Sequence, residues 1–544
     1  MNKAPILFTN KNRTERIQSA QSVDYDLIII GGGITGAGIA LDGSLRGLKV
    51  LLVEKNDFAS GTSSKSTKLI HGGLRYLKQF EFGLVRETGL ERAIAHKNAV
   101  HLVHPENMLL PIVKNGSFNA FTASLAISVY DLLAKVEKDQ RKQKLSKQDV
   151  ISTEPLLKKE GLKSGILYSE YRTDDARLTI ELIKSANRNG ADIFNYLEVE
   201  NFVYSGNKTS GIIAIDHANG KKIKLKGKSI VNAAGPWVDK LRIVDSPKTE
   251  TNIQLSKGVH IVIDREKLNI NQSVYFDAFD NRMIFAIPRG NIVYIGTTDT
   301  FYYDDKDAIH CTESDINYLL NATNHMFDIP TLNINDVKST WAGLRPLIRK
   351  KGKSASELSR KDEIFVSDSG LITIAGGKLT GFRKMAERVV DLVLEKQNKD
   401  CVPCQTEEYK IHGNPFEDYD EYEAFQKSLA NRYPDFDAIE LEYLSDTFGK
   451  DCLEIIETAE SSKDRLLINQ LDYAINFESA FLPIDFIERR TGWLYFSPEK
   501  VRKYLSFIVT YFAKAFSRDQ AWIDRNLNYC EKIYSENTLA DFKS

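Results

Sequence analysis

Two arginines of this sequence lie beside turn residues, where a side chain can project into a site. Arg75 belongs to the segment HGGLRYL, and Arg345 belongs to AGLRPL. A guanidinium grips a phosphate through two parallel hydrogen bonds, so both arginines are candidate phosphate ligands. Tyr76 and Lys378 can supply further donors. The alternative interpretation is that each arginine is only a solvated surface charge.

Two histidines are candidates for a catalytic base. His260 lies in KGVHIV, and His71 begins the HGG turn. Imidazole titrates near neutral pH, whereas guanidinium holds its proton to about pH 12 or above, so we favour His260 as the base. A buried structural histidine remains an alternative for either position.

No metal site is predicted. The nine histidines are scattered, and none forms a ligand-spaced pair with a nearby acid. His101 and His104 are three residues apart and are interpreted as structural. Cys401 and Cys404 form a CxxC pair without a second pair or a redox-fold context, so chance spacing is favoured.

The element that must position this chemistry is encoded in residues 24–54. An apolar strand runs into a GxGxxG turn, a helix and a second strand that ends in Glu54. Gly31 permits the tight turn, Gly33 lets backbone amides approach phosphates, and Gly36 allows the helix to pack closely on the strand. The pyrophosphate of a dinucleotide would lie at the positive end of the helix, and Glu54 would accept hydrogen bonds from ribose hydroxyls.

Composition excludes several classes of protein. Lysine and arginine number 73 against 74 acids, a net charge of −1, so no overall field favours nucleic acid. No apolar run reaches the ~18 residues of a membrane-spanning helix, and the first twenty residues do not form a secretory signal. Five cysteines, an odd and sparse set, indicate a reducing compartment, so a cytoplasmic location is expected.

The chain resembles the FAD-dependent glycerol-3-phosphate dehydrogenase family over about residues 22–395. The resemblance is carried, in order, by DYDLIIIGGGITGAGIA, GTSSKSTKLIHGGLRYL, DDARL, NAAGPW, KGVHIV, GTTDT, AGLRPL and AGGKLTGFRK. It implies an α/β fold in which an FAD-binding Rossmann-like domain of the glutathione-reductase type accompanies a β-sheet substrate domain and an all-α C-terminal domain. It also implies oxidation of sn-glycerol 3-phosphate to dihydroxyacetone phosphate, with electrons passed to membrane quinone.

Pattern and resemblance together predict the domain boundaries. A polar N-terminal arm is expected at 1–20, and a helical C-terminal domain at 405–544. The FAD-binding domain is expected at 21–110, 165–245 and 360–398, and the substrate-binding domain at 111–164 and 246–359. A helix is predicted over 118–136, another over 313–326, and a crossover helix after Thr173 or Asp174 that stops at Gly190.

The resemblance also assigns site residues. The expected substrate site comprises Arg75, Tyr76, His260, Arg345, Lys378 and Thr380. The expected FAD ligands are Gly31, Gly33, Ile34, Thr35, Gly36, Glu54, Lys55, Thr62, Ser63, Lys68, Leu69, His71, Gly72, Ala234, Gly235, Gly376, Gly377 and Lys378. The base stays open between His260 and Arg345, which would polarise the hydroxyl, and Asp299 is either a site residue or a turn cap.

Delivery of electrons to quinone requires contact with lipid. Segment 486–516 mixes basic and aromatic residues in a pattern typical of interfacial helices, so peripheral association with the inner face of the cell membrane is expected. A helical domain with an aromatic core and a solvated basic side is the alternative. The oligomeric state stays open, with a homodimer as one option.

Three other functions remain open. An oxidase would pass the same electrons to oxygen, although the short stretch between AGLRPL and AGGKLT favours the dehydrogenase. An enzyme that oxidises amino acids would use arginine to clamp a carboxylate. A non-catalytic flavin-binding relative would have no need of the substrate-side cations.

Overall fold

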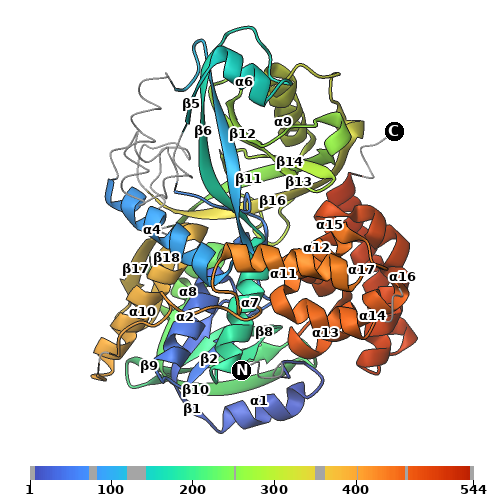
Figure 1. Cartoon of the computed structure of the whole chain (residues 1–544). Helices are drawn as coiled ribbons and strands as arrows, with labels where there is room; N and C mark the ends of the chain where they lie inside the picture. The colour runs from blue at the N-terminus through green and yellow to red at the C-terminus, as the bar shows by residue number, and fades with distance from the viewer. Residues whose placement is uncertain are drawn as a thin grey trace.

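The computed structural model consists of two β-sheets, one above the other in Figure 1, with a bundle of helices packed beside them. It describes residues 7–72, 82–118, 143–249, 253–349, 362–400, 402–459 and 463–539. The predicted fold class is confirmed. The helix predicted over 118–136 lies, beyond Phe118, outside the described residues.

The first sheet has eight strands around a parallel core. Its main order is β17-β18-β10-β1-β2-β7, and β9 pairs with both β8 and β10. The strands are β1 (Asp24–Ile30), β2 (Val50–Val53), β7 (Asp192–Phe194), β8 (Leu197–Ser205), β9 (Lys208–Asp216), β10 (Lys221–Asn232), β17 (Asp362–Val366) and β18 (Ile372–Gly376). β1 and β2 are apolar and buried along nearly their whole length because both faces of a parallel sheet are covered.

Helix α2 connects β1 to β2 and carries the glycine motif at its start. It spans Ile34–Leu45 and packs between α7 (Asp175–Arg188) and α10 (Phe382–Lys396). Asp174 caps α7 as predicted, and the helix ends before Gly190. The predicted strand, turn, helix and strand of residues 24–54 are therefore confirmed.

The second sheet has ten strands. Its main order is β15-β11-β14-β13-β12-β4-β6-β3, β16 pairs with β11, and β5 pairs with β6. The strands are β3 (Leu69–Ile70), β4 (Val103–Val113), β5 (Gln143–Ser146), β6 (Leu162–Thr173), β11 (Ile253–Asp264), β12 (Ser273–Asp277), β13 (Met283–Arg289), β14 (Ile292–Gly296), β15 (Thr300–Phe301) and β16 (Val337–Ile348). Helices α6 (Lys147–Thr153) and α9 (Glu313–Met326) lie at the top of Figure 1, at the end of this sheet that is away from the first sheet. Helix α9 has the predicted bounds.

Parts of the stretches predicted for the FAD-binding domain belong to this second sheet. β3 and most of β4 and β6 lie within 21–110 and 165–245, yet β6 pairs with both β3 and β4 in the second sheet. The chain therefore passes between the two sheets more often than the predicted domain boundaries imply. Helix α4 (Phe82–Asn98) runs between β3 and β4, and α8 (Val238–Asp245) follows β10.

The N-terminal segment is more ordered than a polar arm. Residues Arg13–Gln21 form helix α1, whose Ile17 and Ala20 are buried against the first sheet. Phe8 is also buried, and its amide donates to the carbonyl of Asn476 at 2.8 Å. The start of the chain thus touches both the first sheet and the C-terminal helices.

The C-terminal part of the chain is helical, as predicted. Its helices are α11 (Tyr419–Arg432), α12 (Ala438–Phe448), α13 (Cys452–Glu457), α14 (Lys463–Phe477), α15 (Trp493–Phe496), α16 (Pro498–Ala515) and α17 (Gln520–Thr538). The apolar faces of α14 to α17 form one core with Tyr294 and Trp341 of the second sheet, and α11, α12 and α13 form a separate core.

The proposed membrane segment is partly core. Arg489 and Arg490 are buried, and each places a nitrogen 2.7 Å from the Asp57 carboxylate. Trp493, Tyr495 and Phe512 are buried in the same region. These five side chains cannot contact a lipid surface. The exposed residues of α16 include Arg502, Lys503, Phe507 and Lys514.

Candidate active site

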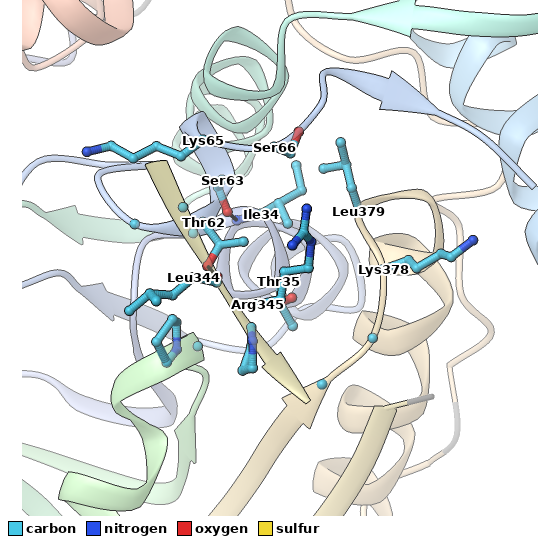
Figure 2. A pocket seen from close by; sticks show the side chains of 18 of the residues that line it. Ile34, Thr35, Thr62, Ser63, Lys65, Ser66, Leu344, Arg345, Lys378 and Leu379 are labelled. Carbon is cyan, nitrogen blue, oxygen red and sulfur yellow. Dashed lines mark hydrogen bonds between the residues drawn. The ribbon is translucent and has the colours of Figure 1, made fainter. Parts of the chain in front are cut away.

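A cavity of about 640 Å³ is lined by residues of both sheets. Four of its segments appear in Figure 2: Ile34 and Thr35, residues 62–66, Leu344 with Arg345, and Lys378 with Leu379. The volume suits a cofactor with a small substrate.

The start of α2 forms one wall of the cavity. Gly31 has φ +117°, and a Cβ there would lie 2.6 Å from the carbonyl oxygen of Ala233. A Cβ on Gly36 would lie 1.9 Å from the carbonyl oxygen of Gly31, so Gly36 permits the close packing of helix on strand that the sequence predicted. The Ile34 amide donates to the Ser63 hydroxyl at 2.9 Å. This helix end presents backbone amides and a partial positive charge to the cavity.

Glu54 is fixed at the end of β2. Its carboxylate accepts from the Gly32 amide at 2.7 Å and from the Asn56 amide at 2.9 Å. Burial raises the pKa of Glu54, although these two amides oppose the shift. The side chain lines the cavity with remaining acceptor capacity, as a ribose ligand requires.

A second glycine turn lies opposite, between β18 and α10. Gly376 and Gly377 have φ +79° and +82°, which lets the chain turn sharply towards the start of α10. Lys378 and Thr380 of this turn line the cavity.

Most of the predicted FAD ligands lie on the cavity wall. They are Gly31, Gly33, Ile34, Thr35, Glu54, Lys55, Thr62, Ser63, Leu69, His71, Ala234, Gly235, Gly376, Gly377 and Lys378. Gly36 and Gly72 lie behind the wall and act through backbone packing and hydrogen bonds.

Lys68 is placed differently from the prediction. It is 2% exposed, and its ammonium lies 2.5 Å from Asp175 and 3.0 Å from the Ser64 carbonyl. Asp175 also accepts from the Ser66 amide and hydroxyl. The Lys68 side chain therefore supports the cavity-lining Lys65–Thr67 loop from behind and does not line the cavity.

Arg345 lies on β16 and reaches the cavity. It donates to the Thr297 hydroxyl at 2.8 Å and to the Thr298 carbonyl at 3.2 Å, and its Nη1 lies 3.6 Å from Asp299. Asp299 lines the same wall and accepts a hydrogen bond from the Ser256 hydroxyl, so it helps to orient the arginine. The guanidinium is thus held in one orientation.

His260 is not on the cavity wall. It is fully buried on β11, stacked on Trp341 with ring centroids 4.6 Å apart, and its Nε2 lies 3.1 Å from the Thr67 hydroxyl. Burial, with the positive charges of Arg345 and Lys68, holds the pKa of His260 well below its ordinary value. Direct proton abstraction by His260 is therefore not supported by its position, because Thr67 is the residue that lines the cavity.

Two predicted substrate ligands, Arg75 and Tyr76, lie outside the described residues. Thr380 is described, and its hydroxyl exchanges hydrogen bonds with the amide and carbonyl of His71 at 3.2 and 3.1 Å. This pairing holds the HGG turn against the AGGKLT turn.

Sequence reasoning missed several residues of the wall. Glu170, Trp237, Thr67, Tyr275 and Phe285 line the cavity. Trp237 belongs to the NAAGPW segment, which could have suggested it. Tyr275 and Phe285 stack at 4.2 Å between strands, and their strand segments carry no signal that distinguishes them from core.

No group of three or more potential metal ligands occurs in the described parts of the chain. Over the same residues, no helix is both long enough and apolar enough to cross a membrane.

Comparison with known proteins decides the family. A model described as FAD dependent oxidoreductase matches residues 26–383, and one described as C-terminal domain of alpha-glycerophosphate oxidase matches residues 404–522. The aerobic glycerol-3-phosphate dehydrogenase of Staphylococcus epidermidis is 47% identical over 508 residues, 90% of this chain and 91% of the relative. The Staphylococcus aureus protein of the same name is 46% identical over 527 residues, 94% and 95% of the two chains. The chain belongs to the FAD-dependent glycerol-3-phosphate dehydrogenase family.

Solved structures of similar proteins have the same fold as this chain. The glycerol-3-phosphate dehydrogenase of Bacillus halodurans, solved with FAD, matches with a TM-score of 0.85 and 40% identity, over 98% of this chain and 99% of that one. An L-alpha-glycerophosphate oxidase from Mycoplasma pneumoniae shares the fold at 21% identity and a TM-score of 0.55, over 68% of this chain and 95% of its own.

The cofactor of this flavoenzyme is FAD, and the wall residues fit it. Gly31 has no Cβ, so a pyrophosphate can approach the backbone closely at the start of α2. The Glu54 carboxylate can accept hydrogen bonds from a ribose. The Trp237 indole nitrogen is buried without a hydrogen-bond partner among the described residues.

Proposed function

We propose that this flavoenzyme oxidises sn-glycerol 3-phosphate to dihydroxyacetone phosphate. The observation that carries the proposal is a cavity with a dinucleotide-type wall that also presents Arg345 and Lys378. FAD binding alone does not require Arg345. The names of the relatives agree with this substrate.

Arg345 and Lys378 would bind the phosphate and orient the substrate. Bound FAD supplies the hydride acceptor for this oxidation. The fixed guanidinium of Arg345 favours an anionic oxygen, because its hydrogen bonds to Thr297 and Thr298 prevent it from swinging away. Arg75, Tyr76 and Thr380 are proposed as further substrate ligands on the resemblance.

Arg345 is also the better placed of the two residues considered for the C2 hydroxyl. It lines the cavity, whereas His260 reaches it only through the Thr67 hydroxyl. We therefore assign Arg345 to polarising the hydroxyl, while the Thr67 hydroxyl takes the substrate proton as it passes its own to His260.

The test of the substrate is anaerobic bleaching of the flavin. Glycerol 3-phosphate should bleach the FAD absorbance near 450 nm in the purified holoenzyme, while glycine and sarcosine should not. Absence of bleaching by glycerol 3-phosphate would defeat the proposal, and bleaching by the amino acids would favour the carboxylate-clamping alternative.

For the electron acceptor we propose membrane quinone. The reduced enzyme should be reoxidised by a soluble quinone faster than by air. Stoichiometric hydrogen peroxide during turnover in air would instead identify an oxidase.

We further propose peripheral association with an anionic membrane surface through the outer face of α16. Arg502, Lys503 and Lys514 are exposed there beside Phe507, whose exposed fraction is 43%. Exposed cations are attracted to anionic headgroups, and an aromatic ring inserts at the interface. Co-sedimentation with anionic vesicles should occur at low salt and fall at 0.5 M salt. The variant Arg502→Glu/Lys503→Glu should lose it, and equal binding by this variant would contradict the assignment.

A further inference from the structure

Side chains hydrogen-bond three of the four main-chain polar groups of the His71–Gly72 turn. Thr380 bonds both the amide and the carbonyl of His71. The Gly72 carbonyl accepts from the Thr88 hydroxyl at 3.2 Å and from the Lys378 ammonium at 3.5 Å. Burial raises the pKa of Glu170, and the nearby Gly72 amide is among the groups that oppose this shift. Three side chains therefore hold this turn, Thr88 from α4 and Lys378 and Thr380 from the AGGKLT turn.

Glu170 is the acid among these side chains. It lies on β6, lines the cavity and is 2% exposed. Arg92 of α4 donates to its carboxylate at 2.9 Å, and the same guanidinium nitrogen donates to the Ser169 carbonyl at 2.8 Å. Arg92 is itself 2% exposed, so the ion pair is shielded from water.

The charge of Glu170 also acts on Lys378. The two residues line the same cavity and interact electrostatically, and both contact Gly72. Burying a charge is costly unless an opposite charge lies nearby. Glu170 therefore compensates Arg92 behind the wall and faces the charge of Lys378, which donates to the Gly72 carbonyl of the turn.

We propose that Glu170 is a positioning residue of the substrate site, which holds the His71–Gly72 turn and Lys378 in the arrangement that receives the phosphate. This role rests on the proposed oxidation of glycerol 3-phosphate. It assigns no proton transfer to Glu170. Its effect on the substrate passes through Lys378 and the turn.

The test replaces the charge and keeps the size. Glu170→Gln should raise the KM for glycerol 3-phosphate at least tenfold, with kcat per bound FAD within threefold of wild type. Inhibition by inorganic phosphate should weaken by a similar factor, because it depends on the same cations.

Glu91→Gln is the matched control. Glu91 lies on the same helix as Arg92 and forms a comparable buried pair with Arg383, whose Nε lies 2.8 Å from its carboxylate. Glu91 does not line the cavity. Its variant should keep KM and kcat within twofold. A KM within threefold of wild type for Glu170→Gln, or equal KM changes in both variants, would overturn the positioning role.

Thr88→Val is a milder variant, which tests the proposal if Glu170→Gln does not fold. Thr88→Val removes one of the hydrogen bonds to the Gly72 carbonyl and should raise KM about threefold. Thr323→Val, which removes a buried helical hydroxyl of α9 that bonds only the Leu319 carbonyl among described partners, should not. Equal KM values in these two would contradict the proposal. Wild-type flavin that glycerol 3-phosphate does not bleach would overturn the proposed function, whereas normal wild-type turnover with an unchanged variant KM overturns only the role of Glu170.

Discussion

The Thr62 hydroxyl donates a 2.6 Å hydrogen bond to the main-chain carbonyl of Leu344. The bond joins the loop after β2 to the strand that carries Arg345, across 282 positions of sequence. Thr62 and Leu344 both line the cavity and lie together in Figure 2. The wall expected to hold FAD is thereby tied to the cation expected to hold the substrate.

Loss of this bond should lower catalytic efficiency. Thr62→Val keeps the side-chain volume and leaves the Leu344 carbonyl without its hydroxyl donor, at a cost of about 1 kcal/mol. If all of this free energy is lost from binding of the transition state, kcat/KM falls about fivefold. Steady-state kinetics would measure it, with Thr209→Val as control, since the Thr209 hydroxyl bonds the Ser369 carbonyl away from the cavity. Equal effects in both variants would contradict the link.

Glu54→Gln should weaken FAD binding. The amide can still accept from Gly32, but the charge-assisted hydrogen bonds to the ribose are lost, at about 1.5–3 kcal/mol. The dissociation constant of FAD should then rise at least tenfold when apoprotein is titrated with FAD. The control Glu395→Gln changes an exposed acid of α10 and should leave it unchanged. An unchanged constant for Glu54→Gln would remove the ribose assignment.

Gly36 and Gly33 should separate stability from cofactor binding. A Cβ at Gly36 meets the backbone oxygen of Gly31 at 1.9 Å, whereas one at Gly33 meets only the Ser63 side chain, at 3.0 Å. Overpacking against backbone costs about 3 kcal/mol or more, so Gly36→Ala should lower the thermal midpoint of the apoprotein by several degrees. Gly33→Ala should leave that midpoint nearly unchanged and weaken FAD binding. The reverse ranking of apoprotein midpoints would refute this account.

The glycine motif was predictable because its evidence is local. Residues 24–54 form consecutive elements, and the packing of Gly36 on Gly31 spans five positions. The bounds of α9 were predictable for the same reason, since Thr312 and Asp315 form a capping box at its start.

Roles that depend on distant partners could not be predicted. Arg489 and Arg490 look like a basic surface pair, but an acid 432 and 433 positions earlier binds both of them in the interior. His260 lies in an apolar strand, and the sequence does not say which face meets the cavity. Glu170 lies in a similar strand. Its positioning role could not be predicted, because it depends on Arg92, Gly72 and Lys378, which only the fold brings near it.

His101 should make the protein less stable in mild acid. Burial, together with the charges of His104, Arg177 and Lys184, holds the pKa of His101 well below its ordinary value near 6.5. The unfolded chain therefore takes up this proton first, so stability is lost as pH falls below about 6.5, by at most about 1.4 kcal/mol per pH unit. Thermal midpoints of wild type and His101→Gln from pH 7.5 to 5.5 would test it. Wild type should lose more than the variant, and a constant difference would exclude this contribution.

Arg345→Met should nearly abolish oxidation of glycerol 3-phosphate without releasing FAD. The guanidinium supplies charge-assisted hydrogen bonds worth about 3 kcal/mol to an anionic substrate, so kcat/KM should fall at least 100-fold. Stopped-flow reduction of the flavin under anaerobic conditions would measure the loss directly. Arg265→Met removes an arginine that bonds Asn269, Gly290 and Ile270 and does not line the cavity, so its reduction rate should match wild type. If Arg345→Met is reduced as fast as that control, the phosphate is bound elsewhere, and the arrangement of Arg345 on Thr297, Thr298 and Asp299 serves structure instead of substrate.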